Sequence, residues 1–398
     1  MPELPEVETI RRTLASRIAG RTIQTVEVYE PRLVQDMPAG SRTLPRDECR
    51  ERPEGRDEGG GLSRGGDENG WPRGDREGYE SLSGAEHDHD RQSEDPDEGG
   101  RSPQNEDVAR VWSEHLTRVL AGKRLAEPGR RGKYLLLPVE GGPWQLVVHL
   151  RMTGQLLVLS ESEWVQKPSH RSLLIRLDQG LVCGLFDVRK FARLYLVRAG
   201  DPDSYPAGLR RLGPEPMEPE WTLAGWRRAL AGRRTPIKSL LLNQEVVAGV
   251  GNIYADEALW RARVHPAWPA GMLNPQQAQA VRRAVRRVLR EGLAAGGTTI
   301  RDYVAADGSQ GDYAAQLHVY GRTGQPCSRC GTPIACIQLA GRSAHFCPRC
   351  QPAAWDTAGG AMEAAAGAEV ASPEDASPED GKADRMPADG MTEVAGWR

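Results

Sequence analysis

Residues 327–350 read CSRCGTPIACIQLAGRSAHFCPRC, and their pattern predicts how the C-terminal part of the chain folds. It contains two C-x-x-C pairs separated by sixteen residues. Two such pairs can bring four thiolates onto one tetrahedral Zn²⁺, and a set of four cysteine ligands leaves no open position for catalysis. Apolar and polar residues alternate on either side of Ala340-Gly341, which predicts a β-hairpin. The sequence therefore predicts a zinc ribbon with one structural metal ion, ligated by Cys327, Cys330, Cys347 and Cys350.

The cysteine count supports this interpretation over a disulfide framework. The chain has seven cysteines, an odd number, and Cys49, Cys183 and Cys336 receive no role. A redox pair is the alternative, but two spaced C-x-x-C pairs on a hairpin do not resemble a thioredoxin-like context. Arg342 follows the predicted turn, where a cation is well placed to contact phosphate, although an exposed arginine on a turn is common.

Charge is distributed unevenly along the 398 residues, of which 52 are basic and 55 acidic. Residues 36–107 hold 10 basic and 21 acidic side chains with few large apolar ones, so we expect a disordered acidic insertion. Residues 353–398, with the repeat ASPEDASPED at 371–380, are expected to form a disordered acidic tail. The rest of the chain has 39 basic and 24 acidic residues, a net charge of +15. This indicates a polyanion-binding body, although a merely solvated arginine-rich surface has the same composition.

The chain begins MPELPEVETIRRTL, without the basic and apolar regions of a secretion signal, and no later run is long enough to span a membrane. A helix is predicted from Pro5 to Gly20, with one apolar face formed by Val7, Ile10, Leu14 and Ile18. Pro2 and Glu3 then project in front of the helix N-terminus. If Met1 is removed, Pro2 carries a secondary amine that is partly unprotonated at neutral pH and is therefore a nucleophile. Most N-terminal amines have no such role, so this feature is weak by itself.

A second helical region is predicted at residues 235–257, TPIKSLLLNQEVVAGVGNIYADE. Thr235 is expected to cap a helix that has Pro236 at its first position. A glycine turn at 249–251 leads to a second helix that begins at Asn252. Exposed amides after Gly251 are expected to bind phosphate, with Lys238 reaching the same group. An ordinary helical hairpin fits the pattern equally well.

Several motifs occur together along the chain, in addition to the ribbon. They are PELPEVET (2–9), RRGKYLLL (130–137), HLRMTG (149–154), DVRKF (187–191), LGPEP (212–216), VVAGVGNIYADE (246–257), GGTTIRDY (296–303) and QLHVYGR (316–322). In this order they resemble the bacterial formamidopyrimidine-DNA glycosylases, base-excision enzymes that remove 8-oxoguanine and ring-opened purines. The resemblance covers residues 1–35 and 106–352 and implies duplex DNA containing oxidised purines or abasic sites as the partner.

The implied fold is α+β. An N-terminal antiparallel β-sandwich with flanking helices is expected over residues 1–215, a helix-two-turn-helix domain over 216–320 and the zinc ribbon over 321–352. DNA would bind in the cleft between these parts. The strand-like stretches KYLLLPV, QLVVHLRM and SLLIRL agree with the sandwich.

The resemblance also implies catalytic roles. Pro2 is the nucleophile that forms a Schiff base at C1′, and Glu3 is the proton donor to the sugar ring oxygen. Lys133 donates a proton in β-elimination, and Arg342 acts in δ-elimination and phosphate binding. Glu6 is a supporting carboxylate or a favourable first-turn acid.

The implied DNA contacts fall into two groups. Phosphate contacts are implied for His149, His170, Arg234, Lys238 and Asn252. The space left by a flipped base is filled by Met152, Arg189 and Phe191, two of which would otherwise be interpreted as core residues. Residues 299–316 correspond to a loop that closes over the flipped base.

Three features leave alternatives open. The insertion and the tail exceed the usual length of the family, and Lys190 stands where many relatives have arginine. The sister endonuclease VIII branch, a catalytically inactive DNA-binding scaffold and a zinc-ribbon RNA factor are the rival interpretations. Leu4, the Met-Arg-Phe set and the GGTTIRDY loop favour the purine enzyme over the endonuclease VIII branch. The intact Pro2-Glu3 start and Lys133 argue against an inactive scaffold, and a zinc-ribbon RNA factor would need no free N-terminal proline. We expect a monomer in the bacterial cytoplasm, associated with the nucleoid, with zinc as its cofactor and no membrane association.

Overall fold

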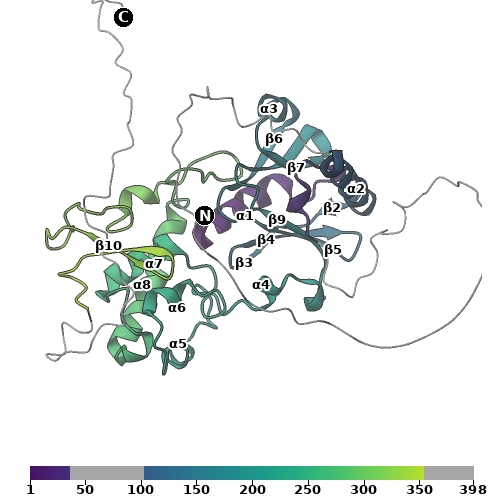
Figure 1. Ribbon diagram of the computed structural model, residues 1–398. Coiled ribbons are helices and arrows are strands. Elements are labelled where there is room, and N and C mark those ends of the chain that lie inside the picture. The colour runs from purple at the N-terminus through teal and green to yellow at the C-terminus, as the bar shows by residue number, and fades with distance from the viewer. Residues whose placement is uncertain (36–102, 354–398) are drawn as a thin grey trace, which may run out of the picture.

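A computed structural model describes residues 1–35 and 103–353 of the chain (Figure 1). The predicted disorder of residues 36–102 and 354–398 lies outside the described residues. The predicted boundaries need two corrections. Helix α2, Pro103–Leu120, includes residues 103–107, which had been assigned to the insertion. Ala353, assigned to the tail, is buried. In both places the folded part extends further than composition alone indicates.

The N-terminal half contains two antiparallel sheets. The first has the strand order β1-β7-β8-β6, with bounds Ile23–Val28, Arg171–Leu177, Leu181–Asp187 and Gly154–Ser160. The second has the order β2-β4-β5-β9, with bounds Arg124–Leu125, Tyr134–Glu140, Trp144–His149 and Arg193–Arg198. Strand β3, Gly129–Arg131, pairs with the start of β4. The three stretches predicted as strands correspond to β4, β5 and β7.

One apolar core is shared by both sheets and by the first two helices. Valine, leucine and isoleucine side chains from the strands of both sheets contribute to this core, as the alternating pattern predicts. Helix α1, Leu4–Ile18, buries the four predicted residues of its apolar face, Val7, Ile10, Leu14 and Ile18. Helix α2 lies against β1, where Ser113 and Thr117 accept hydrogen bonds from backbone amides of the strand.

The C-terminal half is helical up to the ribbon. Its main helices are α5 (Leu223–Leu230), α6 (Ile237–Leu242), α7 (Asn252–Ala262) and α8 (Pro275–Ala294). Helix α7 begins at Asn252, as predicted. The predicted Thr235 cap is wrong, because Pro236 is the N-cap and α6 begins at Ile237. A backbone bridge between Pro236 and Pro269 holds Pro236 in an extended conformation and delays the helix by one residue.

Short elements connect these parts. They are helices α3 (Glu161–Gln166) and α4 (Ala207–Arg210), and 3₁₀ turns at Pro31–Leu33, Asp178–Gly180, Pro202–Ser204, Ala270–Met272 and Tyr313–Gln316. The ribbon strands are β10, Ala335–Leu339, and β11, Arg342–Phe346. Ala340 and Gly341 both have positive φ, which confirms the predicted turn of the hairpin. Within the described parts of the chain, no helix has the length and apolar character that crossing a membrane requires.

Helix α1 belongs to both halves of the molecule. Figure 1 shows the chain start between the sheets and the helices around α7 and α8. Leu4 lies in the apolar core of the helical half, whereas Val7 and Ile10 lie in the core of the sheets. The backbone amide of Leu4 donates to the carbonyl of Gly249 at 3.0 Å. The N-terminal residues are therefore fixed at the junction of the two halves.

Candidate active site

Glu3 occupies the N-terminus of helix α7. Its carboxylate accepts hydrogen bonds from the amides of Gly251 at 2.7 Å and Ile253 at 2.9 Å. A Cβ atom on Gly251 would lie 2.3 Å from Cδ of Glu3, so the glycine permits this close approach. The prediction that these amides are exposed for phosphate is wrong, because an acid from the chain start already occupies them. Burial is the main cause that raises the pKa of Glu3 to about 7, and the charge of Lys133 opposes this shift.

Glu6 links the chain start to the helical half. Its carboxylate accepts hydrogen bonds from the Glu3 amide at 2.8 Å, the Tyr254 hydroxyl at 2.7 Å and the Thr298 amide at 2.7 Å. The side chain is buried, so these three donors compensate for its lost hydration. Glu6 is therefore more than a favourable acid in the first helical turn, since it holds α1, α7 and the segment after α8 together.

Lys133 and Arg342 share a cavity with the chain start. This cavity of about 170 Å³ is lined by Met1, Glu3, Lys133, Met152, Leu242, Gly251, Asn252, Ile253, Tyr320 and Arg342. Burial lowers the pKa of the Lys133 ammonium, while the nearby charges of Glu3 and Glu6 raise it. Burial also lowers the pKa of the Met1 α-amino group. The cavity therefore gathers an N-terminal amine, a protonatable acid and two cations.

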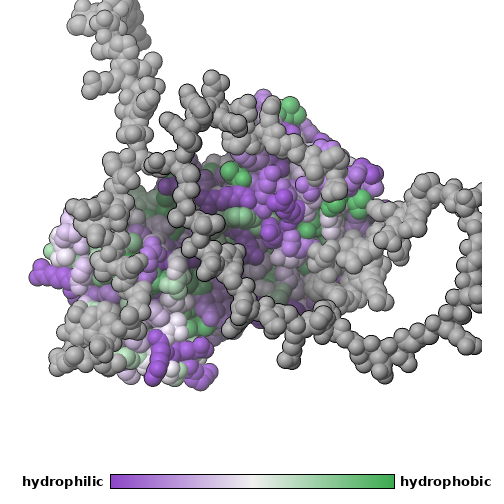
Figure 2. Space-filling model, in the orientation of Figure 1, coloured by the Kyte–Doolittle hydropathy of each residue, from purple (hydrophilic) through white to green (hydrophobic). Residues whose placement is uncertain are grey.

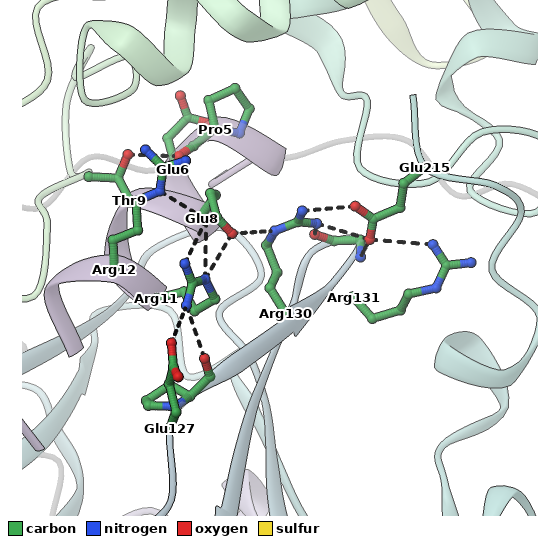
Figure 3. A network of polar contacts seen from close by, with 12 residues as sticks. Pro5, Glu6, Glu8, Thr9, Arg11, Arg12, Glu127, Arg130, Arg131 and Glu215 are labelled. Atoms are coloured by element: carbon green, nitrogen blue, oxygen red, sulfur yellow. Dashed lines mark hydrogen bonds and ion pairs between the residues drawn. The ribbon is translucent and has the colours of Figure 1, made fainter. Parts of the chain in front are cut away.

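A network of arginines and acids holds the backbone beside Lys133 (Figure 3). The Glu215 carboxylate accepts two hydrogen bonds from the Arg130 guanidinium, at 3.0 and 2.8 Å, and one from the Gly132 amide at 2.7 Å. Arg130 Nε also donates to Glu8 on α1 at 3.1 Å. Since Glu215 lies in the segment that leads to the helical half, this network fixes the position of Lys133 relative to both halves.

His149 lies next to this cavity but is held as a neutral ring. Its Nδ1 accepts a hydrogen bond from the Arg151 amide at 3.1 Å, and its ring stacks edge-on against Tyr134. Burial, reinforced by the charges of Arg151 and Lys133, lowers the pKa of His149 to about 3. His149 and Lys133 line a second cavity of about 260 Å³. A phosphate contact from His149 would thus come from a neutral imidazole and stays a prediction.

The three residues expected to replace a flipped base lie on two connected loops. Met152 lines the cavity of Lys133, and Arg189 and Phe191 are exposed on the loop between β8 and β9. The buried carboxylate of Asp187 accepts hydrogen bonds from the Thr153 hydroxyl and from the Arg189 and Ala192 amides. Asp187 therefore braces both loops. Phe191 is 49% exposed, so the alternative interpretation of this residue as core is wrong.

Lys238 does not face solvent. Its ammonium forms an ion pair with Asp256 on α7 at 2.6 Å and donates to the backbone carbonyl of Ser343 on the ribbon. His345 completes the cluster, because its amide and ring Nδ1 lie 3.0 and 3.1 Å from the same carboxylate. Lys238 is buried, and its contacts tie the ribbon to the helices. Its phosphate contact stays a prediction.

The other predicted phosphate contacts differ in their surroundings. His170 and Arg234 are exposed, and Asn252 is half-buried with its side-chain amide 3.3 Å from the Ser343 hydroxyl. The predicted closing loop, residues 299–316, contacts strand β6, where the Val158 amide donates to the Ala306 carbonyl at 2.7 Å. This contact holds the loop against the edge strand of the first sheet.

The four predicted zinc ligands come together at the base of the ribbon. Their sulfur atoms all lie within 4.8 Å of one another, and the distances between Cys330, Cys347 and Cys350 are 3.4 and 3.5 Å. Four sulfurs at about 2.3 Å from one tetrahedral Zn²⁺ are spaced roughly 3.8 Å apart, so the donor set fits this metal. Cys183 and Cys336 are not in the cluster. The site is suited to one structural Zn²⁺.

Sequence motifs contained further site residues that pattern reasoning did not assign. Asp187 begins DVRKF, Glu215 lies in LGPEP, and Asp256 and Glu257 end the motif at 246–257. Glu257 accepts hydrogen bonds from three consecutive backbone amides that precede the ribbon, those of residues 318–320. These acids stand among apolar residues in their motifs, which indicates that they are buried. Their hydrogen-bond partners are distant in sequence.

Comparison with known protein families agrees with this architecture. The formamidopyrimidine-DNA glycosylase N-terminal domain matches residues 1–55 and 101–194, and the H2TH domain of the same enzymes matches 212–304. A zinc finger found in FPG and IleRS matches residues 324–353. These matches define the class of the protein as a DNA glycosylase of base excision repair.

Individual relatives place the chain more closely. A formamidopyrimidine-DNA glycosylase of Heliobacterium modesticaldum is 38% identical over 88% of this chain and 100% of its own length. One from Moorella thermoacetica is 39% identical over 84% of this chain and 93% of its own. The chain belongs to the formamidopyrimidine-DNA glycosylase family, whose members are bifunctional glycosylases and abasic-site lyases.

Solved structures show the same fold. The Lactococcus lactis enzyme in complex with DNA containing an abasic site aligns with a TM-score of 0.64 and 30% identity, over 88% of this chain and 99% of that one. The Thermus thermophilus enzyme aligns with a TM-score of 0.62 and 33% identity, over 88% and 98%. Other L. lactis complexes contain Fapy-dG or an oxidised pyrimidine in the DNA.

Proposed function

We propose that this protein excises oxidised purines, 8-oxoguanine and formamidopyrimidines, from duplex DNA and cleaves the strand by β,δ-elimination. The observation that carries the proposal is the single cavity shared by the chain start, Glu3, Lys133 and Arg342. The damaged-DNA complexes of the L. lactis relative support the substrate class.

The first chemical step uses the amine of Pro2. With Met1 attached, the Pro2 nitrogen is an amide, and removal of Met1 turns it into a secondary amine. This amine attacks C1′ of the damaged nucleotide, the bond to the base breaks, and the base leaves with a proton. The product is an iminium ion joined to the opened sugar. Glu3, whose pKa is about 7, is partly protonated at neutral pH and can therefore protonate the ring oxygen as the ring opens.

The later steps use the two cations. The iminium ion acidifies the hydrogen at C2′, and loss of that proton expels the 3′ phosphate in β-elimination. Lys133 lines the same cavity and transfers protons there, and its lowered pKa makes this easier than for an exposed lysine. Arg342, which lines the same cavity, binds the 5′ phosphate that leaves in δ-elimination. The zinc ion supports the ribbon and takes part in no step.

The proposal is tested by trapping the iminium ion. The full chain is incubated with a duplex that contains 8-oxoguanine opposite cytosine, sodium borohydride is added, and any adduct is mapped by mass spectrometry. We expect an adduct at Pro2 with the damaged duplex and none with an undamaged duplex of the same sequence. Cleavage without a Pro2 adduct would refute the amine mechanism. Adduct formation with an oxidised-pyrimidine duplex but not with 8-oxoguanine would refute the purine specificity.

A further inference from the structure

An arginine-rich groove lies at the end of α7 that points away from the active-site cavity. It has a volume of about 640 Å³ and is lined by Arg261, Ala262, Arg263, Ala280, Arg282, Arg283, Ala284, Arg286, Arg287 and Arg290. Helix α7 has eleven residues and spans about 16 Å. Its N-terminus holds Glu3, and its C-terminus carries Arg261 and Arg263. The groove is therefore separate from the proposed catalytic cavity and shares no residue with it.

The positive charge of this groove is poorly compensated by the described residues. Glu291 forms ion pairs with Arg261 and Arg287, both at 2.9 Å. Among residues 1–35 and 103–353, no carboxylate forms an ion pair with Arg263, Arg283 or Arg290. Clustered guanidinium groups repel one another, so an additional anionic group at this surface would be stabilising.

Other arginines of the groove are held in place. Arg282 donates to the carbonyl of Trp221 at 2.8 Å, and Arg286 donates to that of Pro216 at 2.7 Å. Helix α8 packs against α5 and α7, and Figure 2 shows hydrophilic side chains gathered along the edge of the molecule that carries α5. The groove is thus a preformed, polar surface, which reduces the entropy cost of binding.

The folded chain ends beside this groove. Pro352 lines an adjoining groove of about 690 Å³ together with Arg263, Arg329, Arg349 and the zinc-site residues Cys330 and Cys350. Arg263 lines both grooves, so a continuous basic track leads from the last described residues to α8. Arg329 is fixed along this track because its guanidinium stacks 3.6 Å from the Trp260 ring centroid and donates to the Trp260 carbonyl.

The segment that follows has the complementary charge. Residues 354–398 contain 10 acidic and 3 basic side chains, and four of the acids lie within the run at 374–380. The twenty residues 354–373 precede this run, and an extended chain of that length spans up to roughly 65 Å. Helix α8, with twenty residues, is about 30 Å long. The acidic run can therefore reach every arginine of the groove.

We propose that the acidic C-terminal segment, residues 354–398, binds the arginine groove between α7 and α8 of its own chain. Glu374, Asp375, Glu379 and Asp380 supply the carboxylates. Binding neutralises a basic surface distant from the cleft, so undamaged DNA competes less well for it. The interaction is built from partly exposed ion pairs and therefore weakens as ionic strength rises.

Arginine footprinting of the full chain tests this proposal. Phenylglyoxal modification of Arg283, Arg287 and Arg290 is followed by mass spectrometry in the wild type and in the tail variant E374Q/D375N/E379Q/D380N. We expect roughly threefold slower modification in the wild type at low salt, and equal rates at about 0.5 M salt. Arg110, Arg210 and Arg211, exposed elsewhere on the molecule, serve as reference sites whose rates do not differ.

A second measurement uses the groove variant R283Q/R287Q/R290Q and the matched control R110Q/R210Q/R211Q. When the four tail acids are neutralised in the control variant, we expect the affinity for undamaged duplex to rise several-fold. The same change in the groove variant should raise this affinity clearly less. Equal footprints in wild type and tail variant would overturn the proposal. The proposal would also be overturned if protection of the groove arginines disappeared only when the acids of residues 36–102 are neutralised. That segment would then be the occupant of the groove. Neither outcome affects Pro2 trapping, which tests the proposed function separately.

Discussion

Arg130 and Glu215 face each other in a buried, two-point ion pair that joins strand β3 to the segment leading into the helical half. The same carboxylate accepts the Gly132 amide, directly before Lys133. The position of the lysine in the cavity thus depends on an acid 82 residues further along the chain.

Replacement of Glu215 by glutamine should loosen this connection. The change removes the two-point partner of Arg130 and leaves Glu8 as its remaining carboxylate, so we expect a loss of about 3 kcal/mol in the free energy of unfolding, measured by chemical denaturation. The rate of borohydride trapping should fall more than duplex affinity. Glu114→Gln is the control, because its exposed pair with Arg110 contributes less than about 0.5 kcal/mol. Equal effects of the two variants would contradict this prediction.

Gly251→Ala tests the packing of Glu3 on α7. The added methyl group would overlap the Glu3 carboxyl group, which is buried and bonded to two amides and cannot move without losing them. We expect roughly 100-fold slower trapping, corresponding to about 2.7 kcal/mol. Gly129→Ala is the matched control, since its nearest neighbour would lie at 3.6 Å and φ is not positive. Full activity of Gly251→Ala would show that Glu3 need not occupy this position.

The raised pKa of Glu3 predicts a specific pH dependence of stability. The pKa rises from 4.5 to about 7 on folding, so between these values the folded state binds more protons than the unfolded state. The free energy of unfolding therefore falls as pH rises through this window, by up to about 3 kcal/mol from this group. Glu3→Gln lacks the titration, so the wild type should lose stability relative to the variant from pH 4.5 to 7. Denaturation series on both chains measure this difference, and parallel curves would refute it.

Asp256→Asn should leave the Lys238 ammonium buried without its charged partner. A cost of about 3–5 kcal/mol in the free energy of unfolding is expected. The double variant K238M/D256N should be less destabilised than the sum of the single variants, because the unpaired charge is absent. A double-mutant cycle gives the coupling energy. A coupling energy near zero would mean that the ion pair does not join the ribbon to the helices in solution.

Removal of zinc should release the ribbon while leaving the sheets folded. The small apolar cluster around Val319, Ile334 and the cysteines has too little core to persist without the metal. We expect duplex affinity to fall at least tenfold after chelation, as measured by fluorescence anisotropy, and to return on addition of Zn²⁺. Cys347→Ser should behave like the chelated protein. Cys336→Ser should retain stoichiometric zinc, because Cys336 lies outside the cluster.

Local sequence patterns predicted the elements well. Apolar spacing located helix α1 and its buried face, and the Ala340-Gly341 pair located the ribbon turn, because each depends on residues within a few positions of one another. The cysteine spacing predicted the metal site for the same reason. Helix α7 was placed correctly from the glycine turn before it.

Pattern reasoning failed where a polar group meets a partner distant in sequence. The amides after Gly251 were correctly interpreted as an anion site, but the anion is Glu3, which lies 248 residues away. The type and position of Lys238 predict a phosphate contact, but they do not reveal the buried ion pair with Asp256 that the structure shows. A sequence shows which groups can bind a charge, but the fold determines which charged group they contact.

Helix α1 packs into the cores of both halves, and this determines when the site can form during synthesis. Leu4 and Glu3 have their contacts at Gly249 and Gly251, so the binding place of the chain start does not exist until the ribosome has produced more than 250 residues. Until then the first residues remain accessible to an aminopeptidase, so the proposed removal of Met1 can precede burial of the chain start. A shorter nascent chain holds no assembled cavity.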